Sequence, residues 1–349
     1  MKQGLEYKKG KSLLKKSLLS LFLILIVAVV GGYLYYNSLL SPIDEVGEDR
    51  IVEIPKGYSV KRIASLLEEE GIIKKGFAFE IAVRLKDAQG SLQSGKYVLN
   101  SSMGTMEIIE KISIGEVLDD SIRVTIPEGF ELSMIAARLE ELGITSKEDF
   151  IEEARNIDKY DYPFLRDIPA GRENPLEGYL FPDTYYFSPD VTNEEIIQAM
   201  LERFDEVFKE EYYDRADELG MTIDEIVILA SVVEREARVE SDRPIISGVF
   251  HNRLDQGWKL ESCATIQYIL GERKPRLLYS DLEIESPYNT YMYSGLPVGP
   301  IASFGEASLK ATLYPEETDY MFFVAKDDGS HVFSRTLEEH NAAKKRVLN

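Results

Sequence analysis

The sequence is poor in the residues that form covalent cross-links and metal sites. It has one cysteine, Cys263, and three histidines, His251, His331 and His340. A single cysteine cannot form a disulfide within the chain, and the histidines lack the spacing of a metal-binding motif. The composition therefore excludes a disulfide scaffold and a structural zinc, and we expect no cofactor. His331 and His340 are weak candidates for a catalytic role.

Positive charge is scarce outside the first residues of the chain. The 349 residues carry 61 acidic and 40 basic side chains, a net charge of −21. Six lysines and one glutamate give residues 1–16 a charge of +5, which leaves −26 for the rest. Binding to nucleic-acid phosphates requires clustered lysine and arginine. We therefore expect no nucleic-acid partner.

Charge is absent altogether between Lys16 and Asp44. The centre of this stretch, LLSLFLILIVAVVGGYLYYN, supplies about the 20 apolar residues that a bilayer core requires. We predict a transmembrane helix over residues 17–37, preceded by a cytoplasmic basic tail, residues 1–16, by the positive-inside rule. The remainder of the chain then lies outside the cell. A cleaved signal peptide is the alternative, but no small-residue cleavage site follows the apolar run.

The sequence contains one internal repeat. Residues 52–73, VEIPKGYSVKRIASLLEEEGII, align without gaps with residues 124–145, VTIPEGFELSMIAARLEELGIT, and 11 of the 22 positions are identical. Each copy predicts a short strand, a Pro-x-Gly-aromatic turn and an amphipathic helix that ends at a glycine. In each helix the apolar residues fall at i, i+3, i+4 and i+7, which indicates a core-facing side.

The region between the copies predicts a further strand at residues 97–99 and a helix at 105–114. Strand-turn-helix units of this size with this turn resemble LysM, a module that recognises N-acetylglucosamine polymers. We therefore interpret residues 44–118 as a LysM-like α+β subdomain and 119–160 as a second related repeat or linker. Either glycan binding or simple spacing between the membrane and the rest of the chain fits this region.

The remaining residues, 161–349, are expected to form a catalytic domain of helices and a hairpin, so the predicted fold class is α+β. The segment NPLEGYLFPDTYYFSP, residues 174–189, contains five aromatic residues and three prolines, which indicates a shaped, packed loop. Helices are predicted at 193–208, 222–237 and 242–256. A hairpin is predicted around an Asp328-Gly329 turn.

The predicted helix at 222–237 has apolar residues on nearly every side, which indicates a helix buried at the centre of its domain. It nevertheless ends in Glu234 and Glu236. Burial raises the pKa of a carboxyl group, and a raised pKa suits a general acid for glycoside cleavage. The alternative is a surface network in which Arg235 and Arg238 neutralise the two glutamates.

Several motifs in fixed order resemble one family along the whole chain. LEGYLFPDTYYF, LASVVEREA, SGVFHNRL, ATIQYILG, YNTYMYSGLPVGPIASFGEASLKATLYP and YMFFVAKDDGSHVFSRTLEEHN closely resemble the YceG-like family, the endolytic murein transglycosylases called MltG. The resemblance implies a single-pass plasma-membrane protein whose catalytic domain, related to lytic transglycosylases, cuts nascent peptidoglycan strands internally. Peptidoglycan synthases of the elongation or division machinery are possible partners.

The resemblance also implies roles for particular residues. The second glutamate of the E-x-E pair, Glu236, corresponds to the family's essential acid, whereas periodicity alone does not choose between it and Glu234. Glu234 is then a supporting or substrate-binding residue. The resemblance further suggests sugar contacts from Gln267, which lies in ATIQYILG, and from three residues of the YNTY motif, namely Tyr288, Asn289 and Tyr291.

With one acid, the implied reaction is intramolecular. Glu236 protonates the glycosidic oxygen between MurNAc and GlcNAc, and the C6 hydroxyl of the same MurNAc closes onto C1 to give a 1,6-anhydro end, which would terminate strand elongation. Two alternatives stay open: a muramidase-type hydrolase that uses water, and a non-catalytic wall-binding scaffold. The sequence departs from the family where Ser262, Cys263 and Ala264 stand in place of a usual Asp-Pro, which puts substrate register or efficiency in question.

Overall fold

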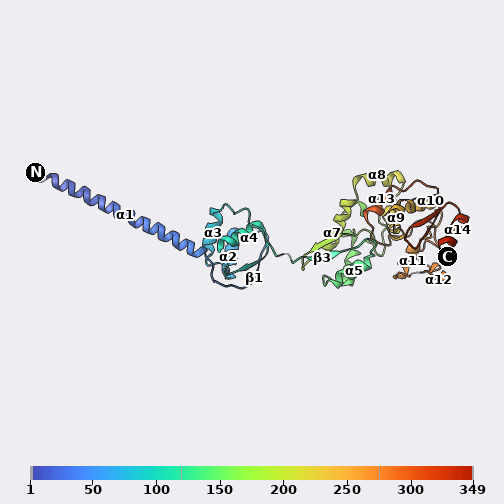
Figure 1. Cartoon of the computed structure of the whole chain (residues 1–349), viewed down its shortest axis with the longest axis horizontal. Helices are drawn as coiled ribbons and strands as arrows, with labels where there is room; N and C mark the ends of the chain where they lie inside the picture. The colour runs from blue at the N-terminus through green and yellow to red at the C-terminus, as the bar shows by residue number, and fades with distance from the viewer. Residues whose placement is uncertain (1–2, 119, 275, 348–349) are drawn as a thin grey trace. The chain divides into compact units, whose positions relative to one another are not determined.

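The computed structural model describes residues 3–118, 120–274 and 276–347. The chain divides into two compact units, Met1–Asp119 and Asp120–Asn349, referred to below as unit 1 and unit 2. Helices and short antiparallel strand pairs occur in both units, so the fold is mixed α+β, as predicted. Figure 1 shows the elements of each unit.

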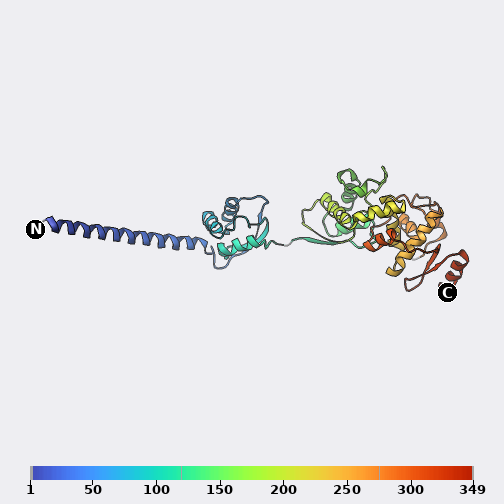
Figure 2. The same cartoon turned by 90° about the horizontal axis from the view of Figure 1, so that it is seen from above.

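Unit 1 begins with one long continuous helix, α1 (Gln3–Leu40) (Figure 2). Its segment Leu18–Leu40 is the one helical stretch of the described residues that is long and apolar enough to cross a membrane. The apolar side chains of this segment are largely exposed, for example Leu19 at 70% and Leu23 at 62%. A helix that exposes apolar side chains all round is typical of a membrane span.

The rest of unit 1 is a small module that covers one strand pair with helices. Strand β1 (Asp49–Ile54) pairs antiparallel with β2 (Gly95–Asn100), and α2 (Val60–Glu69) and α3 (Gly76–Leu85) lie between them in the chain. Helix α4 (Thr105–Ile114) follows. The core gathers the apolar side of each element, including Ile54, Leu67 and Ile109. The helices expected from the first repeat copy and from residues 105–114 are thus present.

Unit 2 begins with the second repeat copy, as β3 (Ile122–Thr125) and α5 (Leu132–Glu141). Strand β3 pairs antiparallel with β4 (Thr184–Phe187), which lies in the long aromatic loop of the sequence. One hydrophobic core includes Val124 and Leu139 of the repeat together with Phe204 and Leu313. The second copy therefore shares its core with residues beyond position 160.

The other elements of unit 2 surround one central helix (Figure 1). That helix is α9 (Ile223–Glu236), and α13 (Glu306–Leu313), α10 (Arg243–Asp255) and α11 (Cys263–Leu270) pack against it. The remaining elements are α6 (Lys147–Ala154), η1 (Ile157–Lys159), η2 (Pro163–Leu165), α7 (Asn193–Val207), α8 (Glu210–Leu219), η3 (Glu240–Asp242), α12 (Tyr279–Leu282) and α14 (Leu337–Val347).

The predicted hairpin is present near the C-terminus. Strand β5 (Phe322–Ala325) pairs antiparallel with β6 (His331–Ser334), and Asp328 and Gly329 lie in the turn between them. Gly329 has a φ of +85°, a conformation that glycine adopts without strain. The hairpin packs against α14 and α10.

Candidate active site

Helix α9 runs through the middle of unit 2 and leaves the core at its last turn. A capping box starts it: Glu225 N–H donates to Thr222 Oγ1 at 3.2 Å, and Thr222 N–H donates to Glu225 Oε2 at 2.8 Å. The residues from Ile226 to Val233 are buried, whereas Glu234, Arg235 and Glu236 keep some exposure to solvent. The end of the helix therefore brings three charged side chains to the edge of the core.

Glu236 lies at the N-terminus of α11. Its Oε1 accepts a hydrogen bond from the Ser262 hydroxyl at 2.5 Å and another from the Ala264 amide at 3.1 Å. Ser262 is the N-cap residue of α11, so the carboxylate lies where the helix dipole is positive. A hydroxyl, an amide N–H and a helix N-terminus all stabilise negative charge on oxygen. The site thus holds Glu236 with specific donors rather than by enclosing it in apolar surroundings.

Thr290 supports the same end of α11. Its hydroxyl accepts a hydrogen bond from the Ser262 amide at 3.0 Å, and it lies 2.9 Å from the Thr265 hydroxyl. Thr290 and Thr265 are both almost fully buried, at 2% and 0% exposure. This buried threonine pair fixes the backbone that presents the two donors to Glu236.

Glu234 lies at the N-terminus of a different helix, α13. Its Oε2 accepts hydrogen bonds from the Gly305 amide at 3.2 Å and from the Ser308 hydroxyl at 2.8 Å. Arg243 lies 3.9 Å from its other oxygen, and the Glu234 side chain is only 9% exposed. Two carboxylates, two residues apart on α9, thus each satisfy the free N–H groups at the start of a neighbouring helix. This accounts for an E-x-E pair at the end of an apolar helix.

Arg235 connects the same end of α9 to the turn of the second repeat copy. Its guanidinium donates to the Gly129 carbonyl at 3.3 Å and pairs with Glu131 at 3.2 Å. This pair is nearly buried, with side-chain exposures of 5% for Arg235 and 14% for Glu131. Ser303 also holds the turn, because it donates to the Phe130 carbonyl and accepts from the Gly129 amide. The second repeat therefore forms one wall of the site.

A hollow of about 750 Å³ lies on the Glu234 side of this wall. Its lining includes Glu128, Glu240, Arg243 and Lys310. The pKa of the Glu128 carboxyl is raised by partial burial and by the neighbouring Glu234 carboxylate, against a lowering contribution from Arg243. The hollow is therefore lined by both acidic and basic groups.

Glu177 is a buried carboxyl group that joins the repeat to α11. It is 3% exposed, accepts from the Leu132 amide at 2.9 Å and from the Tyr268 hydroxyl at 3.2 Å. Burial raises the pKa of Glu177 to about 8, with a further raising contribution from Glu131. Leu132 opens α5 and Tyr268 lies on α11, so this one side chain ties the second repeat to the helix that holds Glu236.

Comparisons with known proteins agree with this architecture. Residues 52–346 match the model of the YceG-like family. The chain belongs to the YceG-like family. It is 39% identical over 332 residues to the endolytic murein transglycosylase of Bacillus subtilis (strain 168), which covers 92% of this chain and 91% of that protein.

Two further relatives extend the comparison. The endolytic murein transglycosylase of Streptococcus pneumoniae serotype 2 (strain D39 / NCTC 7466) is 31% identical over 355 residues, which cover 94% of this chain and 64% of that protein. A crystal structure of a yceG-like protein from Listeria monocytogenes superposes with a TM-score of 0.59 at 35% identity and covers 85% of this chain and all of that one. The YceG-like fold therefore holds for this chain beyond the sequence match.

In this YceG-like chain the Tyr291 side chain of the YNTY motif reaches the N-terminal end of α11. Its hydroxyl lies 3.1 Å from Cys263 Sγ, and Cys263 follows the N-cap residue of α11. Partial desolvation raises the pKa of the Cys263 thiol, although the residue is exposed, and the Glu236 carboxylate adds to the effect. Burial likewise raises the pKa of Tyr291, with contributions from Cys263 and Glu236. Both groups are therefore neutral hydrogen-bonding side chains beside the carboxylate.

The other residues predicted from the sequence make their contacts with residues other than Glu236. Tyr288 packs against Tyr268, with ring centroids 4.9 Å apart. Gln267 donates to the Lys274 carbonyl at 3.2 Å, within the loop that follows α11. Asn289 is 1% exposed, donates to the carbonyls of residues 282 and 284, and accepts from the Tyr291 amide. Asn289 therefore shapes the loop that carries Tyr291.

Sequence reasoning missed Ser262, Thr290 and Glu177 as contributors to the site. Ser262 precedes the apolar run of α11, and a serine in that position is a typical N-cap signal. Thr290 and Glu177 had no such signal, because their partners are 28 and 45 residues away in the chain. Only the folded chain brings these residues together.

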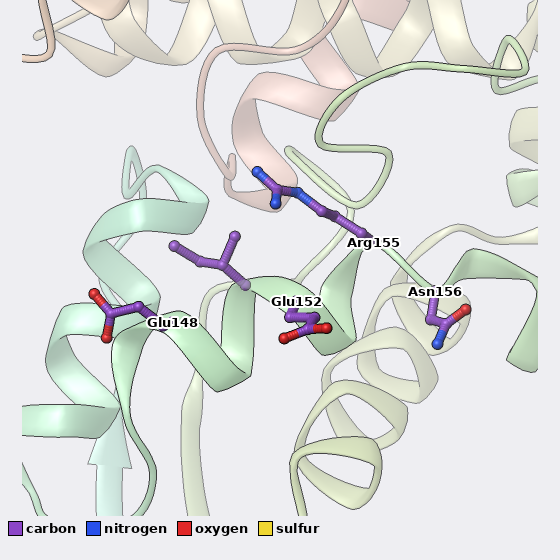
Figure 3. Close-up of a pocket in the computed structure, with 5 residues that line it drawn as sticks. Glu148, Glu152, Arg155 and Asn156 are labelled. Atoms are coloured by element: carbon purple, nitrogen blue, oxygen red, sulfur yellow. The ribbon is translucent and has the colours of Figure 1, made fainter.

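Two features of unit 2 lie apart from these contacts. A hollow of about 640 Å³ is lined by Glu148, Ile151, Glu152, Arg155 and Asn156, which come from α6 and the residues after it (Figure 3).

His331 bonds to Asp242 through its ring Nδ1 at 3.0 Å, and His340 stacks on Phe322. These histidine contacts join the hairpin to η3 and α14, which is a structural arrangement.

Proposed function

We propose that this protein is a membrane-anchored endolytic lytic transglycosylase that cuts the MurNAc-GlcNAc bonds of peptidoglycan strands from within. Membership of the YceG-like family and the names of the relatives from Bacillus subtilis and Streptococcus pneumoniae support this activity. The enzyme belongs to the lyases that act on polysaccharides, because bond cleavage occurs without water.

The observation that carries the proposal is the way in which the Glu236 carboxylate is held. Among the described residues the hydrogen bonds to this carboxylate, from Ser262 and Ala264, both fall on Oε1. Oε2 is the oxygen left to face a substrate. A carboxyl group fixed through one oxygen can transfer a proton through the other without reorienting, which general acid–base catalysis requires.

The reaction then uses Glu236 twice. In the acid form it protonates the glycosidic oxygen, so the bond from that oxygen to C1 of MurNAc breaks and the GlcNAc hydroxyl leaves. The resulting carboxylate, stabilised by the two donors on Oε1, takes the proton of the C6 hydroxyl as that oxygen bonds to C1. The product carries a 1,6-anhydro end and the acid is regenerated. The intramolecular nucleophile removes the entropic cost of recruiting a water molecule.

A supporting role fits Glu234 better than a second catalytic role. Its carboxylate is 9% exposed and already accepts hydrogen bonds from Gly305 and Ser308. A hydrolase with two catalytic carboxylates needs the second one free to act as nucleophile or to activate water. Tyr291 and Tyr288 are proposed to contact the sugars, with Gln267 and Asn289 shaping the loops beside α11.

We also propose the topology and the roles of the outer parts. Helix α1 spans the plasma membrane once with the basic tail in the cytoplasm, since apolar residues follow six lysines and precede an acidic remainder. Unit 2 then faces the wall. The LysM-like residues 44–118 bind glycan or act as a spacer, and residues 119–160 with 161–349 carry the reaction. Peptidoglycan synthases are candidate partners.

The test is a digest of purified glycan strands by the full chain in detergent, read by mass spectrometry. We expect internal fragments with anhydro ends, which are lighter by one water than hydrolysis products. Glu236→Gln should lower turnover about 10²–10⁴-fold, the usual contribution of a positioned acid–base group. Glu338→Gln, an exposed position on α14, is the matched control and should leave turnover unchanged.

Other results would point elsewhere. Reducing ends in place of anhydro ends would establish a hydrolase instead. Full turnover by Glu236→Gln together with loss of turnover in Glu234→Gln would transfer the acid role to Glu234. An absence of fragments with the unmodified chain would leave a wall-binding scaffold.

A further inference from the structure

Helix α3 carries an apolar stripe on its solvent-facing side. Phe77, Ile81 and Leu85 follow one another at intervals of four residues and are 50%, 40% and 76% exposed. Residues four apart lie on one face of a helix. The opposite face of α3 is in the core of unit 1. These three residues are called the α3 stripe below.

The α3 stripe begins where helix α1 ends. The Tyr36 hydroxyl of α1 contacts the Ala78 carbonyl at 3.5 Å, and Lys74 donates to the Ser38 carbonyl at 3.0 Å and to the Ser41 hydroxyl at 2.7 Å. The residue next to Ala78 in the chain is Phe77. Figure 1 shows α3 beside the C-terminal end of α1. Phe77, the first residue of the stripe, is therefore next in the chain to a residue that contacts α1.

The contact also fixes the depth of α3 along α1. The apolar span reaches Leu40, and Tyr36 lies four residues before that end. At a rise of 1.5 Å per residue, Tyr36 is about 6 Å inside the span. The start of α3 is thus level with the zone between headgroups and acyl chains, where interfacial helices bury their apolar faces.

The charges around the α3 stripe complement a membrane surface. Residues 74–86 contain four basic side chains and one acidic side chain, although the chain beyond residue 16 carries −26. Two of the four have acidic partners outside this segment, Lys75 with Glu68 at 3.0 Å and Lys86 with Glu110 at 4.0 Å. Arg84 and Lys86 are exposed at the C-terminal end of α3. Basic side chains beside an exposed apolar stripe are the composition of helices that lie on anionic lipid.

We propose that the α3 stripe inserts into the outer-leaflet surface of the membrane that α1 spans, and so holds the module of unit 1 against the lipid. The inference rests on the proposed anchoring by α1. Phe77, the chain neighbour of Ala78, is expected to be the deepest contact. The module is then fixed by two attachments, a spanning helix and an interfacial helix, rather than by one.

The experiment measures lipid contact at single tryptophans in the full chain. Trp258→Phe removes the one native tryptophan, and Phe77→Trp or Ile81→Trp then places a probe on the stripe. The chain is reconstituted into vesicles of phosphatidylglycerol and phosphatidylethanolamine, with or without bromine on the acyl chains. Bromine quenches a tryptophan that touches the lipid. We expect quenching and a blue-shifted emission at both stripe positions.

Two reference probes make the result decisive. Leu25→Trp, in the middle of α1, reports whether the anchor is inserted. Tyr58→Trp lies in the turn after β1, whose first residue Asp49 pairs with Asn100 near the exit from α1. Five residues of strand separate the turn from that end, about 17 Å. Tyr58 is 37% exposed, similar to Ile81, so the two probes are equally open to solvent. Because of its distance from the end of α1, a tryptophan at position 58 should stay unquenched.

Each pattern of quenching has one reading. Quenching at Leu25, Phe77 and Ile81 without quenching at Tyr58 supports the inference. Quenching at Leu25 alone overturns it and leaves the anchor intact. A blue-shifted but unquenched Phe77 probe whose emission depends on protein concentration overturns it in favour of a second copy on the stripe. No quenching at Leu25 overturns the anchoring proposal, and this inference with it.

Discussion

The two copies of the repeat share half of their residues and have opposite environments. In unit 1 the Pro-x-Gly-aromatic turn is open, with Tyr58 exposed and the Arg62 guanidinium 5.6 Å from its ring. In unit 2 the same turn is docked, with Gly129 and Phe130 bonded to Arg235 and Ser303. One local structure thus serves as a free surface in one unit and as a wall of the candidate site in the other.

A few side chains account for this difference. In the first copy Ser59 caps its own helix, because its hydroxyl accepts the Arg62 amide at 3.4 Å. Glu131 takes the equivalent position in the second copy and makes no such cap bond; it pairs with Arg235 instead. Glu177 then supplies the acceptor for the first amide of α5. In the second copy a distant residue supplies the cap, and Glu131 pairs with α9 instead.

The largest effect is expected from removing the ion pair that holds the second repeat copy against α9. Arg235→Met leaves the nearly buried Glu131 carboxylate without its partner, and breaking a buried ion pair on one side costs about 3–5 kcal/mol. We expect the free energy of unfolding of unit 2 to fall by that amount in urea titrations, with a loss of turnover at denaturant concentrations where the chain is still folded.

Arg138→Met is the matched control for this change. Arg138 lies on the same repeat helix and pairs with Glu141 at 3.6 Å, but this pair is at the surface. Its removal should change stability by less than about 1 kcal/mol. Equal losses for the two variants would mean that docking to α9 does not stabilise the second copy.

The second prediction concerns Glu177, which accepts the hydrogen bond from the first amide of α5. Burial raises the pKa of Glu177 to about 8 from a usual value of 4.5. Between these pH values the folded chain keeps a proton that the unfolded chain releases. The free energy of unfolding should therefore fall as pH rises from about 4.5 to 8, by up to about 1.4 kcal/mol per pH unit, and level off above it.

Glu177→Gln isolates this contribution. The amide cannot ionise, so urea titrations from pH 5 to 9 should show a shallower loss of stability than in the unmodified chain, with the two curves parallel above pH 8. The first copy offers the contrast, since its cap, Ser59, does not titrate. Parallel curves over the whole range would contradict a raised pKa at Glu177.

The smallest effect is expected from a matched pair of turn glycines. Gly57 and Gly129 occupy the same position in the two copies, with φ values of +85° and +76°. An alanine at either should cost about 1–2 kcal/mol from left-handed strain. Around Gly57 a Cβ would meet nothing within 4 Å, whereas at Gly129 it would lie 3.5 Å from Arg235 Cδ.

Stability and turnover together separate the two glycines. Both alanine variants should lose similar stability in urea, while only Gly129→Ala should lower the rate of strand cleavage, because its turn bonds to Arg235 and Ser303. A similar drop in turnover for Gly57→Ala would show that the open copy also acts on the reaction.

The sequence was informative wherever a local pattern decided the structure. Predicted helices at 105–114, 193–208 and 222–237 correspond to α4, α7 and α9 within one residue at each end. The hairpin turn at Asp328-Gly329 is also confirmed. Capping residues and apolar periodicity act over a few residues, so they can be read from the chain itself.

Long-range pairing could not be read in this way. Nothing in residues 122–125 indicates pairing with 184–187, and this pairing is what joins the second repeat to the aromatic loop. The sequence indicated charge at Glu234 and Glu236. It did not indicate that the N-termini of α13 and α11 would donate hydrogen bonds to these carboxylates. Whether Glu236 acts as the acid is still a prediction, because it depends on a substrate and not on contacts within the chain.

The donors to the E-x-E pair come from late in the chain, so the pair is held in place only late in synthesis. Glu236 needs donors at positions 262 and 264, and Glu234 needs donors at 305 and 308. Because a chain is synthesised from its N-terminus, unit 1 is complete long before these residues have been made. A nascent or truncated product that stops short of them holds its glutamates without their helix partners. On the proposed role of Glu236, we therefore expect no cutting activity until synthesis has almost finished.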